Sequence, residues 1–282
     1  MWANRKQGEA PCHVQGLDRK DKTVTSLSVL TMNLRHETEA DGPNNWPNRK
    51  ELVARLIRET APHLFGTQEG RRPQIEGLHA LLDGFVLSDR HRNWDPERYY
   101  PCIFFRPDSL ELVDSGDRWL SETPLVHASK SWGSAFPRLV TWAHFRTTEN
   151  PVEFLFACAH LDHLEPRARE GQAQILSGLL REVNPDSRPI VLVGDFNDLP
   201  GSAPYEVLTA FLRDALLEGN PSQAEVHTWH GFKGKGEVGR LDWILVSREV
   251  KVCEAEILRT SYGDAYPSDH FPVRALLEIG PS

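Results

Sequence analysis

The chain has 282 residues, of which 39% are hydrophobic and 26% are charged, a composition typical of a soluble globular protein rather than of a disordered or fibrous one. Its formal net charge is −8, from 32 Lys and Arg against 40 Asp and Glu, and this counts against a protein that holds long nucleic acid through bulk electrostatics. Four cysteines without CxxC spacing exclude a disulfide-rich scaffold and argue against a zinc ribbon or a redox pair.

The N-terminal segment is polar and charged, without the apolar stretch of a secretory signal peptide, and no later segment is apolar for long enough to span a bilayer. We therefore expect residues 1–25 to form a poorly ordered tail and the protein to be cytoplasmic. No linker rich in Pro, Gly or Ser divides residues 26–282, and one core can hold that length, so we expect them to form one domain.

The first third of the chain predicts alternating strands and helices. A strand is predicted at 27–33, where strand formers alternate. After a polar loop, Pro47 opens a helix that Pro62 ends. A buried strand at 63–69 and a second helix at 73–82 follow.

Four strands without helix-length spacers are predicted in the middle of the chain, at 100–105, 110–120, 138–145 and 152–160. Their short connections favour antiparallel pairing. A helix with one apolar side covers 173–183, and the apolar run 189–194 is typical of a strand buried on both faces. Three last strands are predicted at 240–246, 250–258 and 272–279. This order predicts a mixed α/β fold of two packed sheets with helices outside.

Six polar clusters follow or lie within these apolar strands. They are Asn33, Gln68-Glu69, His160, Gly194-Asp195-Phe196-Asn197, Arg240-Leu241-Asp242-Trp243 and Ser268-Asp269-His270. A single polar residue at a strand end is more often a turn or cap residue, so the argument depends on all six together. Their common position predicts that catalytic groups gather at one edge of the sheets.

Three of these residues offer hard oxygen donors. The carboxylates of Glu69 and Asp269 and the amide oxygen of Asn33 suit Mg²⁺, Mn²⁺ or Ca²⁺ better than zinc or copper. Magnesium typically takes only one or two protein carboxylates and leaves positions for water and phosphate oxygens. The pattern therefore indicates a divalent-metal site.

The remaining polar residues suit acid–base chemistry beside such a metal. His160 and His270 can exchange protons near neutral pH, and a carboxylate such as Asp242 can orient a histidine. Asn197 can donate a hydrogen bond to an oxyanion. Together these groups predict metal-assisted hydrolysis of a phosphoester.

The ordered motifs TMNLR, GTQEG, AHLDH, GDFND, RLDWI and PSDHFPV resemble those of the endonuclease/exonuclease/phosphatase superfamily. The resemblance covers the chain from about residue 27 onward. It implies the DNase I-like fold, a four-layer α/β sandwich of two mostly antiparallel mixed sheets with helices outside. The segments GPNNWPNRKELVARLI, WLSETP and FPRLVTWA are most similar to a bacterial group in that superfamily without a firmly assigned substrate.

The resemblance also implies roles for the metal-side residues. Asn33, Glu69 and Asp269 would hold or adjoin the metal, which we expect to be Mg²⁺, with Mn²⁺ or Ca²⁺ as alternatives. Asp195 and Asn197 would position the attacking water and the phosphate oxygens.

For the proton-transfer residues, the resemblance implies a polarised His–Asp pair of His270 and Asp242 at the scissile phosphate. His160 would contact the phosphate or protonate the leaving oxygen. Members of the superfamily differ in which group is the base and which the acid.

Arg138, Arg35 and His163 are further candidates for contacts with the substrate phosphate. Arg138 opens a predicted strand, and a guanidinium makes bidentate contacts with phosphate that lysine cannot; a surface ion pair is the alternative. For His163, a place at the substrate rim is favoured over metal binding, because the rest of the ligand set is rich in oxygen.

Other segments have simpler interpretations. Lys233-Gly234-Lys235-Gly236 lacks Walker spacing and is interpreted as a hairpin tip near the site. The runs Arg71-Arg72 and 89–92 are interpreted as solvated surface. Four tryptophans in turn-rich segments could stack on a base or sugar, although packing is favoured for each of them: Trp46, Trp94, Trp132 and Trp229.

The leading hypothesis is a divalent-metal-dependent phosphoester hydrolase, in which water attacks phosphorus in a small or medium phosphodiester or phosphomonoester. A DNA or RNA nuclease with the same site is the principal alternative, disfavoured by the net charge. A catalytically inactive binding protein on this fold is the lesser alternative, and the retention of all six motifs argues against it.

Overall fold

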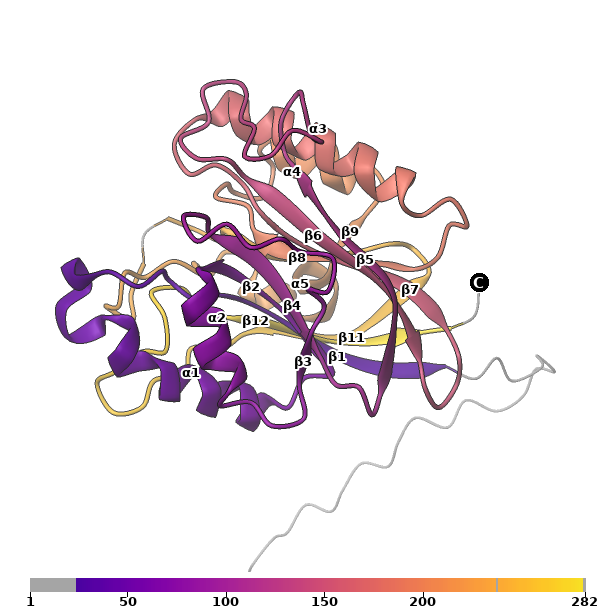
Figure 1. Cartoon of the computed structure of the whole chain (residues 1–282). Helices are drawn as coiled ribbons and strands as arrows, with labels where there is room; N and C mark the ends of the chain where they lie inside the picture. Colours follow the sequence, from indigo (N-terminus) through magenta and orange to yellow (C-terminus); the bar gives the residue numbers. More distant parts are fainter. Residues whose placement is uncertain (1–23, 237, 281–282) are drawn as a thin grey trace, which may run out of the picture.

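Two sheets pack together in the structure, a computed structural model that describes residues 24–236 and 238–280 (Figure 1). Residues 1–23, nearly all of the predicted tail, lie outside this description. The first sheet has the strand order β11-β12-β1-β2-β4-β3. Its strands are β1 (Thr25–Asn33), β2 (Leu64–Gly70), β3 (Val86–Leu87), β4 (Tyr100–Phe105), β11 (Val250–Ile257) and β12 (Val273–Ile279).

The second sheet has the order β5-β6-β7-β8-β10-β9. Its strands are β5 (Leu110–Trp119), β6 (Leu139–Thr147), β7 (Glu153–His160), β8 (Ile190–Asp195), β9 (Arg213–Asp214) and β10 (Asp242–Val246). The β1–β2 and β7–β8 pairs are parallel, whereas the other pairs are antiparallel, so both sheets are mixed.

Helices cover the outer faces of the two sheets (Figure 1). The pair α1 (Trp46–Thr60) and α2 (Arg72–His79) packs on the first sheet, and the pair α3 (Pro166–Glu182) and α4 (Ala203–Thr209) packs on the second. The short elements are η1 (Glu39–Asn44), α5 (Ala215–Gly219) and η2 (Pro221–Gln223). The predicted four-layer α/β sandwich is confirmed, because two sheets lie between two layers of helices.

Three hydrophobic layers hold these elements together. One lies between the sheets and includes Val29, Phe156 and Val193. The other two lie under the helices, around Phe65 on the first sheet and around Leu192 on the second. Each fully buried large apolar side chain contributes about 1.5–3 kcal/mol, so all three layers stabilise the fold.

Gly66 in β2 marks a close approach of the two sheets. A Cβ atom at this position would lie 2.6 Å from Val193 Cγ2 in β8 and 2.7 Å from Cys158 Sγ in β7. These distances are shorter than van der Waals contact, so a side chain at this position would force the packed interior apart. Glycine is therefore needed here for packing.

Strand register brings the polar strand ends together. Asn33 of β1 pairs with Gln68 of β2 in the first sheet. In the second sheet, Asp195 of β8 pairs with His160 of β7 on one side and with Asp242 of β10 on the other. Polar residues distant in sequence thus meet at one edge, as predicted.

The structure also departs from the prediction in places. The loop before α1 contains the 3-10 helix η1, and β3, β9, α4 and α5 were not predicted. The interpretation of 89–92 as solvated surface is wrong for Arg92, whose side chain is 2% exposed and pairs with Asp117 at 2.7 Å. A buried guanidinium needs polar partners that offset its lost hydration, and the Asp117 carboxylate is such a partner here. Within the described residues, no helix is both long and apolar enough to cross a membrane.

Candidate active site

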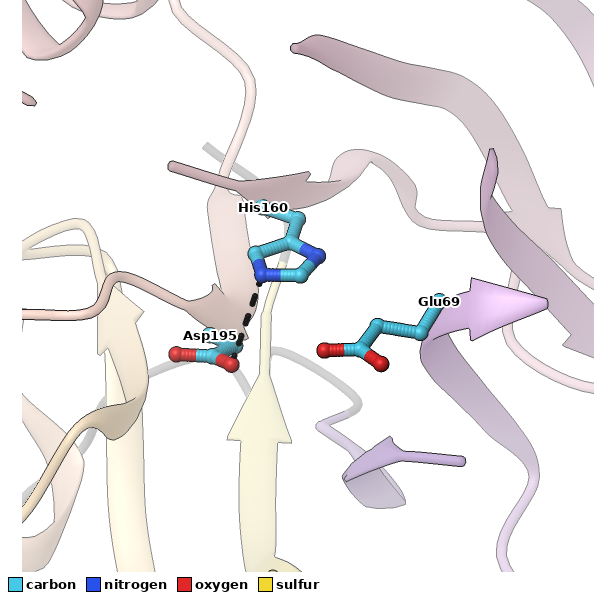
Figure 2. Close-up of side chains that lie close together, drawn as sticks. All are labelled: Glu69, His160 and Asp195. Carbon is cyan, nitrogen blue, oxygen red and sulfur yellow. Dashed lines mark ion pairs between the residues drawn. The ribbon is translucent and has the colours of Figure 1, made fainter. Parts of the chain in front are cut away.

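A group of side chains suited to metal binding lies where β2, β7 and β8 end. The ligand atoms of Glu69, His160 and Asp195 all lie within 4.8 Å of one another. Figure 2 shows the three side chains pointing toward one another, with His160 Nε2 3.5 Å from Asp195 Oδ2. Glu69 comes from the first sheet and the other two from the second, so the group bridges the sheets.

Asn33 connects the two carboxylates of this group. Its Nδ2 donates to Glu69 Oε1 at 3.1 Å and to Asp195 Oδ2 at 2.9 Å. Its Oδ1 accepts a hydrogen bond from the backbone N of Arg35 at 2.8 Å. The amide was predicted as an oxygen donor to a metal; in this structure it holds the two carboxylates together through its nitrogen.

Glu69 is held in a defined position and charge state. Its backbone has a φ of 66°, and its Oε2 accepts from the His36 backbone N at 3.1 Å and from His36 Nδ1 at 2.8 Å. Burial raises the pKa of the Glu69 carboxyl, but the hydrogen bonds from His36 and Asn33 and the nearby His160 ring outweigh burial. The pKa therefore lies well below its usual range, and Glu69 is anionic at neutral pH.

A second group joins Asp195 to Asp242 and His270. His270 Nδ1 donates to Asp242 Oδ2 at 2.9 Å, and its Nε2 lies 3.9 Å from Asp195 Oδ2. Burial alone would lower the pKa of His270, but the carboxylates of Asp242 and Asp195 raise it well above its usual value. The predicted His–Asp pair is thus present as a geometric arrangement, with the ring held as a cation.

Asp195 belongs to both groups, and its carboxyl interacts with the charges of each. Burial and the neighbouring carboxylate of Asp242 raise the pKa of Asp195 to about 7. Its Oδ1 accepts from the Asn197 backbone N at 3.0 Å, and Asn197 has a φ of 51° in the turn that follows β8. This turn directs the Asn197 side chain back toward His160, whose Nε2 lies 3.0 Å from the amide.

Arg138 forms the cationic side of the site. Its Nη1 donates to His160 Nδ1 at 3.1 Å and its Nη2 donates to His163 Nδ1 at 3.2 Å. Its Nε has no partner among the described residues, and burial lowers the pKa of the guanidinium. A buried guanidinium that donates to two histidines is suited to an anionic ligand. Burial and Arg138 together lower the pKa of His160 well below its usual value.

One cavity of about 420 Å³ collects most of these side chains. Eight of the predicted site residues line it: Arg35, Glu69, Arg138, His163, Asp195, Asn197, Asp269 and His270. The other three, Asn33, His160 and Asp242, are buried and contact the lining residues. The structure therefore brings together all the residues that the sequence singled out.

Two of the residues in the cavity wall have partners that the sequence did not reveal. Arg35 makes a two-point contact with Asp41, with distances of 2.9 and 3.0 Å, and its Nε lies 4.0 Å from Asp269 Oδ2. Burial raises the pKa of Asp269. Asp269 belongs to neither ligand group found among the described residues, although it is near enough to Glu69 for the two negative charges to interact.

The cavity wall also contains residues that were not predicted to belong to the site. They are His36, which directly follows the TMNLR motif, Tyr99, Phe136 of the FPRLVTWA segment and Leu241 of the RLDWI motif. Of the four tryptophans, Trp229 lines the cavity, whereas Trp46, the first residue of α1, is buried in the hydrophobic layer between α1 and the first sheet. The segment predicted as a hairpin tip, 233–236, begins in a turn that follows Trp229 and lies outside any strand. Aromatic wall residues could have been found only from the three-dimensional arrangement, because they come from separate loops.

The two-sheet sandwich and this site define a phosphoesterase-type hydrolase fold. The model of the Endonuclease/Exonuclease/phosphatase family matches residues 30–270, and the chain belongs to that family. Members of the family are hydrolases that act on phosphoesters and generally use divalent metals.

Solved structures agree with this assignment. A family protein of Bacteroides thetaiotaomicron has a TM-score of 0.83 and 29% identity, covering 92% of this chain and 97% of its own. The mannosyl-6-phosphatase of the same species has a TM-score of 0.81 and 28% identity, covering 89% and 99%. The human Nocturnin catalytic domain, with a TM-score of 0.69, 20% identity and coverage of 89% and 94%, shares the fold.

Among curated proteins, Protein angel of Drosophila melanogaster is 24% identical over 208 residues. The match covers 72% of this chain and 58% of that protein, so the chain spans less than two thirds of the length of this relative.

Proposed function

We propose that the protein is a divalent-metal-dependent hydrolase of small phosphoesters, in which water attacks phosphorus. One observation carries the proposal: a single cavity is lined by the Glu69 carboxylate, by the His270 ring that Asp242 holds and by the buried guanidinium of Arg138. These groups supply a site for a cation, a proton donor or acceptor and a site for phosphate oxygens.

The donor set fits a hard divalent cation. Glu69 and Asp195 offer carboxylate oxygens within 4.8 Å of a ring nitrogen of His160, and Glu69 Oε1, which accepts one hydrogen bond from Asn33 Nδ2, keeps a second lone pair. We infer that Glu69 is the main ligand, with Asp195 and Asp269 beside it, and that the metal is Mg²⁺ or Mn²⁺. When bound, the metal polarises phosphoryl oxygens and stabilises the leaving group.

The chain's own residues would position the reacting groups. Arg138 would contact phosphate oxygens, with His163 and the Asn197 amide beside it. Asp195 would orient the attacking water, because burial keeps its pKa near neutrality and lets it accept a proton. His270, a cation held by Asp242, would stabilise negative charge on phosphorus-bound oxygen.

The substrate is proposed to be a small ester, with a phosphomonoester favoured over a polymer. This rests on similarity to a mannosyl-6-phosphatase that covers 89% of the chain, and on the acidic net charge of −8. A nuclease remains the second candidate because Danio rerio TDP2, solved with a single-stranded DNA product, shares the fold at a TM-score of 0.70 and 15% identity, covering 90% of this chain and 99% of its own.

The test is hydrolysis of a phosphomonoester and of bis-p-nitrophenyl phosphate with Mg²⁺ or Mn²⁺. We expect turnover that EDTA abolishes and that added metal restores; turnover unaffected by EDTA contradicts the metal requirement. Asn197→Ala and His270→Ala should each lower kcat by about 100-fold or more, since removing one positioned donor to a negatively charged oxygen costs about that much. His127→Ala serves as the control, because this histidine side chain is 63% exposed and lies outside the cavity wall.

A further inference from the structure

Two aromatic rings form a corner in the wall of the cavity. Tyr99 directly precedes β4, and Phe136 lies in the loop before β6. Their ring centroids are 6.5 Å apart with an interplanar angle of 87°, so the ring planes stand at a right angle. Both residues line the same cavity as Glu69, Asp195 and His270.

Neighbouring groups fix the orientation of both rings. Arg71 lies 4.8 Å from the Tyr99 ring centroid and donates to its hydroxyl at 3.1 Å, while the His36 ring lies 5.0 Å away. Phe136 stacks on His163 with centroids 5.7 Å apart and planes 17° from parallel. A ring held this way loses little conformational entropy when a ligand binds.

Phe136 nevertheless remains 47% exposed. An exposed phenyl ring in a rigid cavity wall is typical of a surface that a ligand covers. The corner also adjoins the phosphate side of the site, because His163 stacks on Phe136 and accepts a hydrogen bond from Arg138. A group esterified to a phosphate near Arg138 would therefore lie close to the corner.

We propose that the corner of Tyr99 and Phe136 binds the ring of the substrate alcohol, so that the substrate is a phosphate ester of one sugar or one nucleoside. This rests on the proposed phosphoester hydrolysis. Successive bases of a nucleic acid strand stack on aromatic faces that follow one another along a groove. Two planes at a right angle enclose one ring, and an apolar sugar face or a base fits such a corner equally well.

The test compares ring-bearing and ring-free substrates. The substrates are glucose 6-phosphate, uridine 5′-monophosphate and glycerol 3-phosphate, and the variants are Phe136→Ala and Tyr99→Ala. We expect KM for at least one ring-bearing ester to rise about tenfold in each variant, as expected for loss of one stacked ring. KM for glycerol 3-phosphate, which has no ring, should rise less than KM for that ring-bearing ester. Leu217→Ala, a 42% exposed position on α5, is the control for a lost apolar side chain.

Glucose 6-phosphate and uridine 5′-monophosphate distinguish binding of a sugar from binding of a nucleoside. A rise in KM that is selective for either of them supports the proposal. Equal changes for ring-bearing and ring-free esters overturn it, because they indicate a general structural effect. Calorimetry of the same three esters binding to His270→Ala, with and without Phe136→Ala, measures how much the corner contributes to affinity in the absence of turnover. If the wild-type protein hydrolyses no phosphoester, the proposed function fails. The difference in binding then shows by itself whether the corner of Tyr99 and Phe136 binds a ring.

Discussion

Two histidines of the same cavity are driven to opposite charge states by their neighbours. His160 is buried against Arg138, which lowers its pKa, whereas His270 faces Asp242 and Asp195, which raise its pKa. Both start from an unperturbed pKa of about 6.5. A pair of titratable groups pushed apart in this way is the arrangement that acid–base chemistry near pH 7 requires.

The surroundings of a third histidine, His230, lead us to expect that the free energy of unfolding depends on pH. It is buried, stacks on Phe271 at 4.0 Å and accepts a hydrogen bond from the Gly234 backbone N at 3.2 Å. Burial, with His270 and His227 nearby, lowers its pKa to about 4. Between that value and about 6.5 the unfolded chain binds the extra proton, so the free energy of unfolding falls as pH drops through this window.

Urea denaturation between pH 7 and pH 4 measures this effect. His230→Phe keeps a ring against Phe271 but cannot be protonated, so we expect its stability to fall less steeply than that of the wild type. The difference between the two proteins isolates His230 from the carboxylates that titrate in the same range. Parallel curves of unfolding free energy against pH for the two proteins would show that His230 does not cause the loss of stability.

Arg49 in α1 connects this helix to the loops of the site through hydrogen bonds. This buried guanidinium donates from Nη1 to the carbonyls of Leu34 at 2.9 Å and Pro267 at 2.7 Å, and from Nη2 to that of Arg35 at 3.2 Å; its Nε donates to the carbonyl of Asn44. It thereby joins the loop after β1 to the loop that carries Asp269. Four backbone acceptors thus contact one side chain, and the carbonyl of Arg35 also accepts from Gln74 Nε2 at 2.9 Å.

Arg49→Met should therefore lower the free energy of unfolding by about 2–4 kcal/mol, because the buried carbonyls lose their donors. Arg55→Met on the same helix is the matched control. Its side chain is 57% exposed and pairs with Glu59, so we expect a much smaller loss. Urea denaturation measures both, and equal losses would show that Arg49 makes no special contribution.

The sequence predicts elements well where local signals and tertiary packing agree. The predicted ends of β4 and β8 agree with the structure to within one or two residues. Both strands are continuous apolar runs, because their side chains are buried on both faces. The two-residue strands β3 and β9 have no periodicity to detect and exist only through their neighbours. For the site, strand-end motifs located Glu69 and Asp195, whereas Tyr99 lies in no quoted motif and meets Phe136, of the segment FPRLVTWA, only in the folded chain.

At the scale of the whole molecule, the site is assembled from both sheets. Asn33 and Glu69 come from β1 and β2, and His270 precedes β12, all in the first sheet. His160 and Asp195 come from β7 and β8 in the second. The geometry of the cavity therefore depends on how the two sheets pack, including the close approach at Gly66.

The charge of the whole molecule predicts weak binding of polymeric nucleic acid. With a net charge of −8, we expect binding of duplex DNA to be weaker than about 0.1 mM at physiological salt, below ordinary non-specific affinity. Plasmid DNA should then neither be cut nor inhibit hydrolysis of a small ester. Inhibition at micromolar DNA that weakens steeply with salt would instead favour the nuclease alternative.

The position of β12 has a consequence for how the molecule is built. This strand, the last along the chain, occupies the middle of the first sheet, between β11 and β1. Until it inserts, β1 exposes an unpaired edge, and neither Asp269 nor His270 can reach the cavity. Without the segment from Asp269 onward, the chain would hold the Glu69 carboxylate without the His270 ring that lines the same cavity.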